Sequence, residues 1–244
     1  MPFFTKDDAR IYYEIRGAGY PLLLLPPGGM GATIEFWERT AFNAVEIFSE
    51  HFRVIALDQR NAGRSSGPLS EGDPWALYLA DHIGLLNHLG IAKCHVLGCC
   101  IGSSYALNLA KSAPERIASL VLEQPVGLDD GNDQVMPNAW RAWAEGMLAK
   151  NPDLDAETLE AFGKRMWGSD FVLSVSREDI SNCQTPMLVL PGIDLFHPTE
   201  IGREVARLAP NARILEPWKE PADLVPGTIA KIRAFLNNNT PAAS

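Results

Sequence analysis

A cysteine stands between two glycines at a spacing typical of a catalytic nucleophile on a sharp turn. Gly98 and Gly102 lie two residues before and two residues after Cys100, and Ser103 and Ser104, which are also small, follow. A nucleophile on a strand-to-helix turn takes a strained backbone conformation, so its second neighbours must be small. We therefore predict that Cys100 is the nucleophile.

The neighbours of Cys100 favour a reactive thiol. Cys99 occupies the variable position of the motif, and we expect it to be packed away. A helix that begins after Cys100 would point its N-terminus at the sulfur, and its partial positive charge favours the thiolate, which is the reactive form. A structural alternative stays open, in which the glycines flank a buried, inert cysteine in a tight turn.

Short apolar runs alternate with helical patterns along the chain. Two strands joined by a turn at Asp7-Asp8 are expected to form a hairpin that leads into a core strand. The strands expected from the turn onwards cover residues 10–16, 21–26, 52–57, 94–98, 117–122, 186–190 and 212–215. The expected helices cover residues 75–90, 101–113, 199–209 and 224–236. Right-handed crossovers turn this order into an α/β fold, a mostly parallel sheet covered by helices on both faces.

Residues 124–181 interrupt the alternation of strands and helices. We predict a core formed by residues 1–123 and 182–244, with residues 124–181 inserted as a helical cap. A crevice between cap and core is where a small-molecule site is expected. The expected pocket residues are Met30, Trp140, Trp143 and Trp167, with Arg141 as a further candidate. Ordinary packing of these aromatic residues is the alternative.

Four segments, in this order, resemble α/β-hydrolases of the small, cap-bearing type over nearly the whole chain. They are residues 25–31 after the third strand, 58–65 after the fourth, 98–102 around Cys100, and 191–194 after the strand beyond the insertion. The resemblance implies an eight-stranded sheet and a nucleophile on a sharp elbow. It also implies an acid after a late strand and a histidine after the last strand.

An oxyanion hole is expected beside the nucleophile. It needs two backbone N–H donors aimed at one point, and glycine lets a substrate approach the backbone closely. The N–H groups of Gly29 and Ile101 are the expected pair, and the resemblance implies the same two positions. Pro27 stands where the family usually has histidine, a change that leaves the donor in place.

The histidine that the resemblance implies is missing. Residues 216–223 follow the last expected strand without one, and no histidine follows His197. His197 lies on the loop after Asp194, at the sheet end where Cys100 is expected, which makes it the candidate base. The alternative is a loop histidine that faces solvent. The other four, expected to be structural or surface residues, are His51, His82, His88 and His95.

Two carboxylates are candidates for the acid. Asp194 occupies the position that the resemblance implies, after the strand beyond the insertion. Glu123 ends the strand that follows the elbow, which the resemblance implies as an alternative place for the acid. Both stay open at this point.

Composition excludes several classes of protein. With 21 Lys and Arg against 30 Asp and Glu, the net charge is −9, which disfavours nucleic acid and anionic membrane surfaces as partners. No apolar run approaches the roughly 20 residues of a membrane span. The four cysteines form no metal-ligand spacing and no phosphate-binding loop is present, so we expect no metal and no cofactor. The first ten residues carry no basic and apolar leader pattern, which predicts a cytoplasmic protein.

The leading functional hypothesis is a hydrolase of a small activated acyl compound, such as a thioester, lactone or reactive ester, acting through an acyl-enzyme on Cys100. A carbon–carbon bond hydrolase is a second enzymatic hypothesis. The rival of another class is a non-hydrolytic binding protein that keeps the fold and the pocket, suggested by the missing histidine. The oligomeric state stays open.

Overall fold

A single mixed sheet runs through the computed structural model, which describes residues 2–69, 72–129, 131–132, 134–150, 154–168 and 171–242. Its strands are β1 (Phe3–Lys6), β2 (Ala9–Arg16), β3 (Pro21–Leu25), β4 (Arg53–Leu57), β5 (Cys94–Cys99), β6 (Ile117–Glu123), β7 (Met187–Leu190) and β8 (Ala212–Ile214). They are ordered β1-β2-β4-β3-β5-β6-β7-β8. β1 pairs with β2, and β2 with β4, in antiparallel fashion, whereas all other neighbours are parallel.

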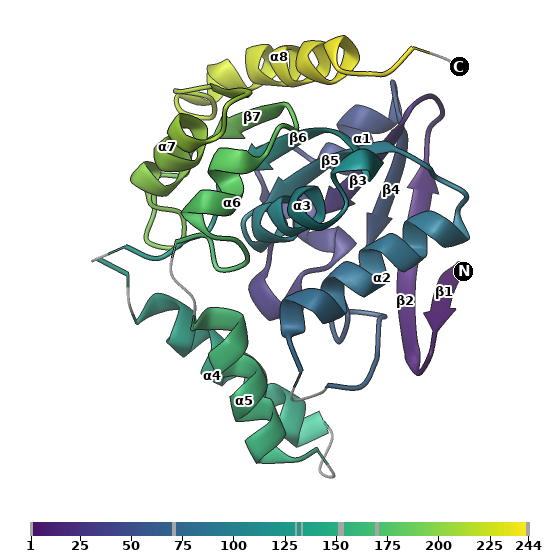
Figure 1. The fold of residues 1–244 in the computed structure, drawn as a ribbon, viewed down its shortest axis with the longest axis vertical. Coiled ribbons are helices and arrows are strands. Elements are labelled where there is room, and N and C mark those ends of the chain that lie inside the picture. Colours follow the sequence, from purple (N-terminus) through teal and green to yellow (C-terminus); the bar gives the residue numbers. More distant parts are fainter. Residues whose placement is uncertain are drawn as a thin grey trace.

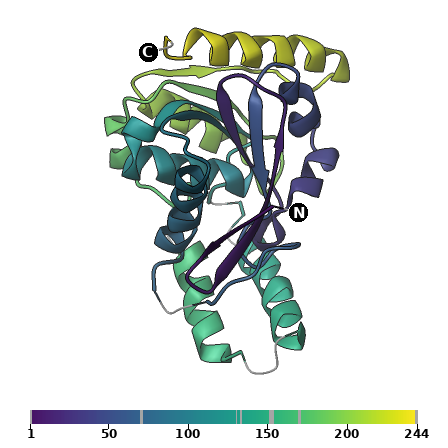
Figure 2. The same cartoon turned by 90° about the vertical axis from the view of Figure 1, so that its right-hand side faces the viewer.

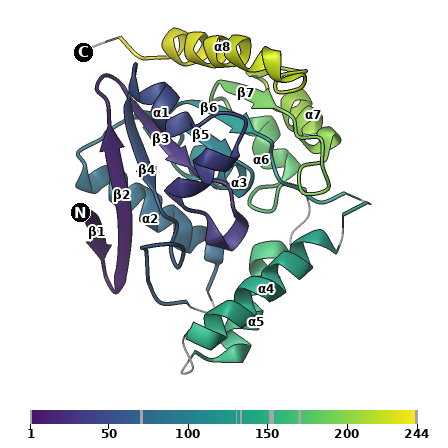
Figure 3. The same cartoon turned by 180° about the vertical axis from the view of Figure 1, so that it is seen from behind.

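Helices cover both faces of the sheet (Figure 1). They are α1 (Ala44–Ser49), α2 (Pro74–His88), α3 (Ile101–Ser112), α4 (Val135–Lys150), α5 (Ala156–Trp167), α6 (Arg177–Asn182), α7 (Thr199–Leu208) and α8 (Val225–Asn238). Figure 3, drawn from behind, shows α1 on the face opposite to α3. No helix among the described residues is both long enough and apolar enough to cross a bilayer.

The alternation of side chains along β3 explains why both faces need helices. Leu23 and Leu25 belong to the core under α2 and α3, whereas Leu22 and Leu24 belong to the core under α1 and α8. All four leucines are fully buried. A strand that is apolar on both sides is stable only in the middle of a covered parallel sheet, because either exposed face would leave leucine in water.

The helices α4 and α5 extend away from the sheet as a pair (Figure 2). Asp155 caps the start of α5 by accepting from the backbone N–H groups of Glu157 and Thr158. After α5 the chain returns to the core, where Phe171 and Val172 are buried. The Ser104 hydroxyl donates to the carbonyl of Val172 (2.8 Å), which holds this returning segment against α3.

The observed architecture confirms the predicted α/β fold with an eight-stranded, mostly parallel sheet flanked by helices. The predicted hairpin is β1–β2, with the turn at Asp7-Asp8. The sequence reasoning did not foresee the short helical segments between β3 and β4, which are η1 (Gly29–Gly31), η2 (Ile34–Arg39) and α1. Segments this short carry too few turns to display a helical period.

Candidate active site

Cys100 lies on the sharp turn between β5 and α3. Its backbone has φ 57° and ψ −122°, a region that residues with a side chain rarely adopt. Two hydrogen bonds fix the turn, because the N–H of Cys100 donates to the carbonyl of Glu123 (2.9 Å) and the N–H of Ser103 donates to that of Cys100 (3.0 Å). The turn projects the sulfur out of the sheet and into a cavity.

The glycines around Cys100 are required by close backbone contacts. A Cβ atom on Gly98 would lie 2.1 Å from the carbonyl oxygen of Gly102. A Cβ atom on Gly102 would lie 2.0 Å from the carbonyl oxygen of Leu25, on the neighbouring strand β3. Both distances are far below a van der Waals contact, so only glycine allows the turn to pack at this place.

His197 is held by Asp194, three residues earlier in the loop after β7. The imidazole Nδ1 lies 2.8 Å and 2.9 Å from the two carboxylate oxygens of Asp194. The carboxylate also accepts from the backbone N–H groups of Phe196 (3.0 Å) and His197 (3.1 Å). Gly192 leaves room for the ring, since a Cβ atom there would lie 2.2 Å from the Cβ of His197.

The other ring nitrogen of His197 faces Cys100. This Nε2 atom is buried and has no hydrogen-bond partner among the described residues. His197 and Cys100 line the same cavity, and their side chains interact through charge. The structure thus brings the three predicted residues Cys100, His197 and Asp194 together, with the imidazole between the carboxylate and the sulfur.

Opposite charges on Cys100 and His197 stabilise each other. Burial by itself would raise the pKa of the Cys100 thiol, but the His197 charge and the N–H groups of Ile101 and Gly28 outweigh it and lower that pKa. Burial would likewise lower the pKa of His197, whereas the thiolate and the bond to Asp194 raise it. The pair therefore favours a thiolate beside an imidazolium.

The backbone donors near the sulfur differ in part from the predicted pair. Ile101 and Gly28 supply the N–H groups that bond to the thiolate. Gly29 lines the same cavity at the start of η1, one residue further on. Gly28 has φ 121°, a conformation closed to other residues, and the run of two glycines after two prolines is the sequence signal that points to it.

Glu123 is buried at the end of β6 without a bonding partner. It has no exposed surface, and neither carboxylate oxygen has a hydrogen bond among the described residues. Burial raises the pKa of Glu123 to about 8, although the charges of Lys219 and His197 act in the opposite direction. Of the two candidate acids, the structure joins Asp194 to His197 and leaves Glu123 unbonded.

Lys219 occupies the loop after β8, where the resemblance implies a histidine. Its ammonium group donates to the side-chain oxygen of Gln124 and lies over the Trp218 ring, 5.5 Å from the ring centre. The Trp218 indole donates to the carbonyl of Pro191 (2.7 Å), which ties this loop to the one that carries His197. Neither Lys219 nor Gln124 was foreseen as part of the site.

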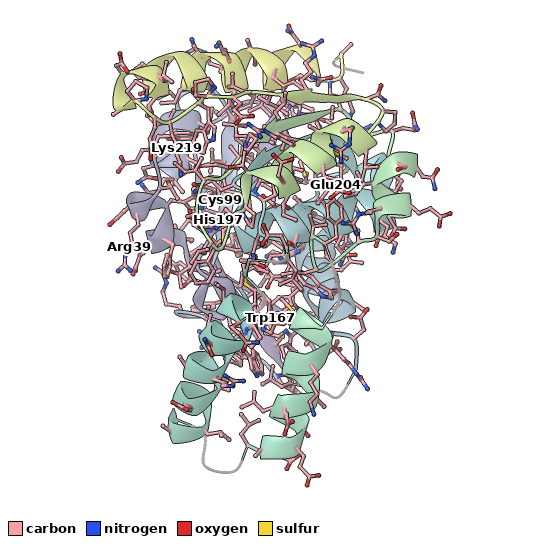
Figure 4. All side chains as sticks on the ribbon, turned by 90° about the vertical axis from the view of Figure 1, so that its left-hand side faces the viewer. Arg39, Cys99, Trp167, His197, Glu204 and Lys219 are labelled. Carbon is pink, nitrogen blue, oxygen red and sulfur yellow. The ribbon has the colours of Figure 1, made fainter. Side chains whose placement is uncertain are left out.

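A cavity of about 580 Å³ opens above Cys100. The four predicted pocket residues, Met30, Trp140, Trp143 and Trp167, all line it. Arg141 is exposed and bonds Asn138 instead (2.8 Å). Figure 4 labels His197, Cys99, Arg39 and Trp167, four lining residues that come from different parts of the chain. Cys99 has no exposed surface.

The other histidines make structural contacts. His82 and His95 are buried and bond the side chains of Gln59 (2.9 Å) and Ser119 (2.8 Å). His51 bonds Arg233 at the surface, and His88 packs against the Tyr13 ring. Within the described ranges, no group of three His, Cys, Asp or Glu side chains is placed to hold a metal ion.

Comparisons with known proteins agree with the fold. A family model described as alpha/beta hydrolase fold matches residues 21–190. A putative carbamate hydrolase RutD of Azorhizobium caulinodans is 35% identical over 134 residues, which are 54% of this chain and 47% of that protein. The acetyltransferase component of the acetoin cleaving system of Pseudomonas putida is 38% identical over 120 residues, 49% of this chain and 30% of that protein. The chain thus spans about half or less of the curated relatives it matches.

Solved structures match over nearly the whole length. The meta-cleavage product hydrolase of Pseudomonas fluorescens has a TM-score of 0.70 at 20% identity, covering 95% of this chain and 96% of that one. The enol-lactonase of Burkholderia xenovorans has a TM-score of 0.68 at 21% identity, covering 97% of this chain and 100% of that one. At such identities the likeness is one of fold.

Proposed function

This chain belongs to the alpha/beta hydrolase fold family, and from that premise we propose that it hydrolyses a small activated acyl compound through an acyl-enzyme on Cys100. The observation that carries the proposal is the position of His197. Its Nδ1 is fixed by Asp194 and its Nε2 faces the Cys100 sulfur. A binding protein that had lost turnover would have no need of this arrangement.

In the first half of the reaction, the Cys100 thiolate attacks the carbonyl carbon of the substrate and forms a carbon–sulfur bond. The carbonyl oxygen becomes negative and accepts from backbone N–H groups at the elbow, those of Ile101 and of Gly28 or Gly29. The bond to the leaving group then breaks, and the leaving group takes the proton from Nε2 of His197. The acyl group is left on the sulfur as a thioester.

In the second half, neutral His197 acts as the base. Its Nε2 takes a proton from a water molecule while the water oxygen attacks the acyl carbon. The carbon–sulfur bond breaks, the acid is released, and Cys100 returns as a thiolate beside the His197 imidazolium. Asp194 keeps the ring oriented through both halves and stabilises its positive charge.

The helices α4 and α5, which belong to the predicted cap, contribute to the proposed reaction. Trp140 and Trp143 from α4 and Trp167 from α5 form an apolar wall of the cavity above Cys100. An apolar wall excludes bulk water and strengthens the charge interactions of the intermediate. We therefore assign the predicted cap, residues 124–181, the role of shielding the reaction from bulk water.

The names of two relatives fit an acyl substrate. Carbamate and enol-lactone, the groups in those names, both carry a carbonyl bonded to a leaving group, and the enolate released from an enol-lactone is a good one. The carbon–carbon hydrolase stays the second candidate, because His197 supplies the proton-transfer group that this reaction requires. The two reactions differ in the bond that breaks: ester, thioester or lactone hydrolysis cleaves a carbon–oxygen or carbon–sulfur bond of the substrate, whereas the carbon–carbon hydrolase cleaves a carbon–carbon bond.

The test is intact-mass spectrometry after mixing the protein with a p-nitrophenyl ester and with a thioester. The wild type should gain the acyl mass and lose it again, and Cys100→Ala should gain nothing. Cys183→Ala is the matched control, because Cys183 is the other partly accessible cysteine and lies away from the cavity. In His197→Ala we expect the adduct to persist, with release slowed by about 10²-fold or more.

Two results would contradict the acyl-enzyme. One is the absence of any adduct with every acyl group while the fold is intact, and the other is an adduct on Cys183 that Cys100→Ala leaves unchanged. Turnover of a vinylogous diketone without an adduct would favour the carbon–carbon hydrolase. Binding without any turnover would favour the non-hydrolytic hypothesis.

A further inference from the structure

Apart from the Cys100 thiolate, the charged side chains among the described residues that line the cavity are positive, in a protein of net charge −9. The described residues that line the cavity include Arg39 and His197 but no aspartate and no glutamate. The Gln124 side-chain oxygen already accepts from Lys219, and the Thr40 hydroxyl donates its proton towards the carbonyls of Trp37 and Phe42. Apart from the thiolate, the charged groups of the wall are hydrogen-bond donors, which favours acceptors in the ligand.

Arg39 is the cation that the reaction itself does not use. It ends η2, and its guanidinium lies over the Phe36 ring, 4.9 Å from the ring centre. It forms no ion pair in the part of the chain that the structure describes, although the nearby Arg64 pairs with both Asp58 and Glu35. A guanidinium held over an aromatic ring keeps its donors free for a planar anion.

Trp167 gives a second, independent sign of an acceptor in the ligand. Its indole Nε1 is buried and has no hydrogen-bond partner among the described residues. The ring lines the cavity from α5, on a different element from Arg39 (Figure 4). A buried N–H group without a partner is costly, and a substrate oxygen would satisfy it.

We propose that the substrate carries a carboxylate in addition to its activated carbonyl, and that Arg39 binds this carboxylate. The body between the two groups is apolar or aromatic and packs on Trp140 and Trp143, while an oxygen of the substrate accepts from the indole N–H of Trp167. This inference rests on the proposed hydrolase function and narrows its substrates to carboxylate-bearing esters, thioesters or lactones. Arg39 selects the substrate and takes no part in bond breaking.

The experiment compares substrates that differ by one charge. The probes are the S-phenyl thioester of 4-carboxyphenylacetic acid and its methyl ester, which is neutral, and both are rigid enough to prevent attack by their own carboxylate. A second pair places the carboxylate on the leaving group, as the phenylacetate ester of 4-hydroxybenzoic acid and its methyl ester. Each rate is divided by the rate of hydroxide hydrolysis of the same compound.

In at least one of the two pairs, the corrected kcat/KM of the wild type should be about tenfold higher for the carboxylate than for its methyl ester. Tenfold is the usual scale of one charged hydrogen bond. Arg39→Met should reduce this ratio to about one, and Arg39→Lys should retain part of it because lysine keeps the charge without the fork of donors. Arg207→Met is the matched control, since Arg207 is an exposed arginine on α7, outside the cavity lining, and its loss should leave the ratio unchanged.

Failure of this inference and failure of the proposed function give different results. Turnover of both methyl esters with no preference for either carboxylate would overturn the Arg39 site and leave the hydrolase standing. If no compound is turned over, binding of 4-carboxyphenylacetate to Cys100→Ala, followed by tryptophan fluorescence, still tests the site. Saturable quenching that Arg39→Met abolishes would support it, and unchanged quenching would overturn it.

Discussion

Cys100 and His197 act as one unit whose charge state depends on both residues. The structure lowers the pKa of the thiol mainly through the His197 charge, against a burial effect of opposite sign. Removing the imidazole therefore removes the charge that stabilises the thiolate and leaves the effect of burial, which raises the pKa of the Cys100 thiol. The consequence can be measured without any knowledge of the substrate.

We expect alkylation of Cys100 by iodoacetamide to rise at a lower pH in the wild type than it does for an ordinary thiol, since the thiolate is the reacting form and its pKa is lowered. In His197→Ala the pH profile should move to higher pH, so that the rate at pH 7 falls. Rates are read from the intact mass over a pH series. An unchanged profile in His197→Ala would contradict the coupling, and His51→Ala is the surface control.

Glu123 should make the folded protein less stable as the pH rises. Its pKa is raised from an ordinary value of 4.5 to about 8, so the folded state holds a proton that the unfolded state has released. Stability from this group is complete below pH 4.5 and is lost as the pH rises towards 8. Glu123→Gln, which is neutral at every pH, should therefore gain about 4 kcal/mol over the wild type at pH 8.

The measurement for Glu123 is urea unfolding of both proteins at pH 5 and pH 8. The difference between them should be small at pH 5, where the wild-type carboxyl is protonated in the folded state. An equal difference at both pH values would show that the effect comes from packing rather than from charge. A wild type that is more stable than Glu123→Gln at pH 8 would mean that the ionised Glu123 carboxylate forms a favourable bond when the protein is in solution.

At the scale of elements, the turn between β5 and α3 depends on backbone contacts that only glycine allows. Gly98→Ala would place a Cβ atom 2.1 Å from a carbonyl oxygen inside the turn. We expect a loss of stability of about 3 kcal/mol or more, because the backbone must shift to relieve the overlap. Urea unfolding of Gly98→Ala and of the wild type, followed by circular dichroism, measures this loss of stability.

Gly146 is the matched control for this substitution. It lies within α4, and a Cβ atom there would meet no atom within 4 Å. Since alanine is the better helix former, Gly146→Ala should stabilise the protein by about 0.5–1 kcal/mol. Opposite signs at the two glycines would support the contact argument, whereas equal effects would contradict it.

Elements also show how far the sequence could guide the prediction. The buried strands and the helices that flank them follow from the alternation of apolar runs and helical periods, and their ends agree to within about two residues. The segments η1 and η2 were missed, although they carry Gly29 and Arg39 to the cavity. Asp58 holds the start of η2, because it accepts from the N–H of Ile34 (2.9 Å) and binds Arg64 (2.8 Å). That contact joins two loops and leaves no pattern within either one.

At the scale of the whole molecule, the sheet and the α4–α5 pair differ in how tightly they are packed. Residues 101–110 of α3 are all buried, whereas Met136 is the one buried residue among the described residues of α4. We therefore expect backbone amides of α4 to exchange hydrogen with solvent faster than those of α3. A ligand or acyl group in the cavity should slow the exchange of α4, because the tryptophans of that helix form its wall.

Hydrogen exchange followed by mass spectrometry tests both statements on the same protein. Peptides from α3 and α4 are compared in the free protein and after acylation of Cys100. Equal protection in the free protein would contradict the packing argument. Unchanged exchange in α4 after acylation would contradict its role as a wall of the substrate site, and α8, which is remote from the cavity, is the internal control.

The sequence by itself determined the fold class, the turn around Cys100 and the set of residues among which the active site had to be found. These features are local: a strand or helix period and a glycine two positions from a cysteine are visible along the chain. The three predicted pocket tryptophans, Trp140, Trp143 and Trp167, follow from the same reasoning, since an inserted pair of helices rich in tryptophan must bury its rings against the core.

Tertiary structure decided which of these residues meet. Only the folded chain brings Nε2 of His197 to the Cys100 sulfur, joins Asp194 to that ring, and leaves Glu123 buried without a partner. It also places Gly28 at the thiolate and Arg39 at the cavity wall. The physical reason is that each of these relations is a distance between loops from different strands, set by the packing of the sheet and its helices.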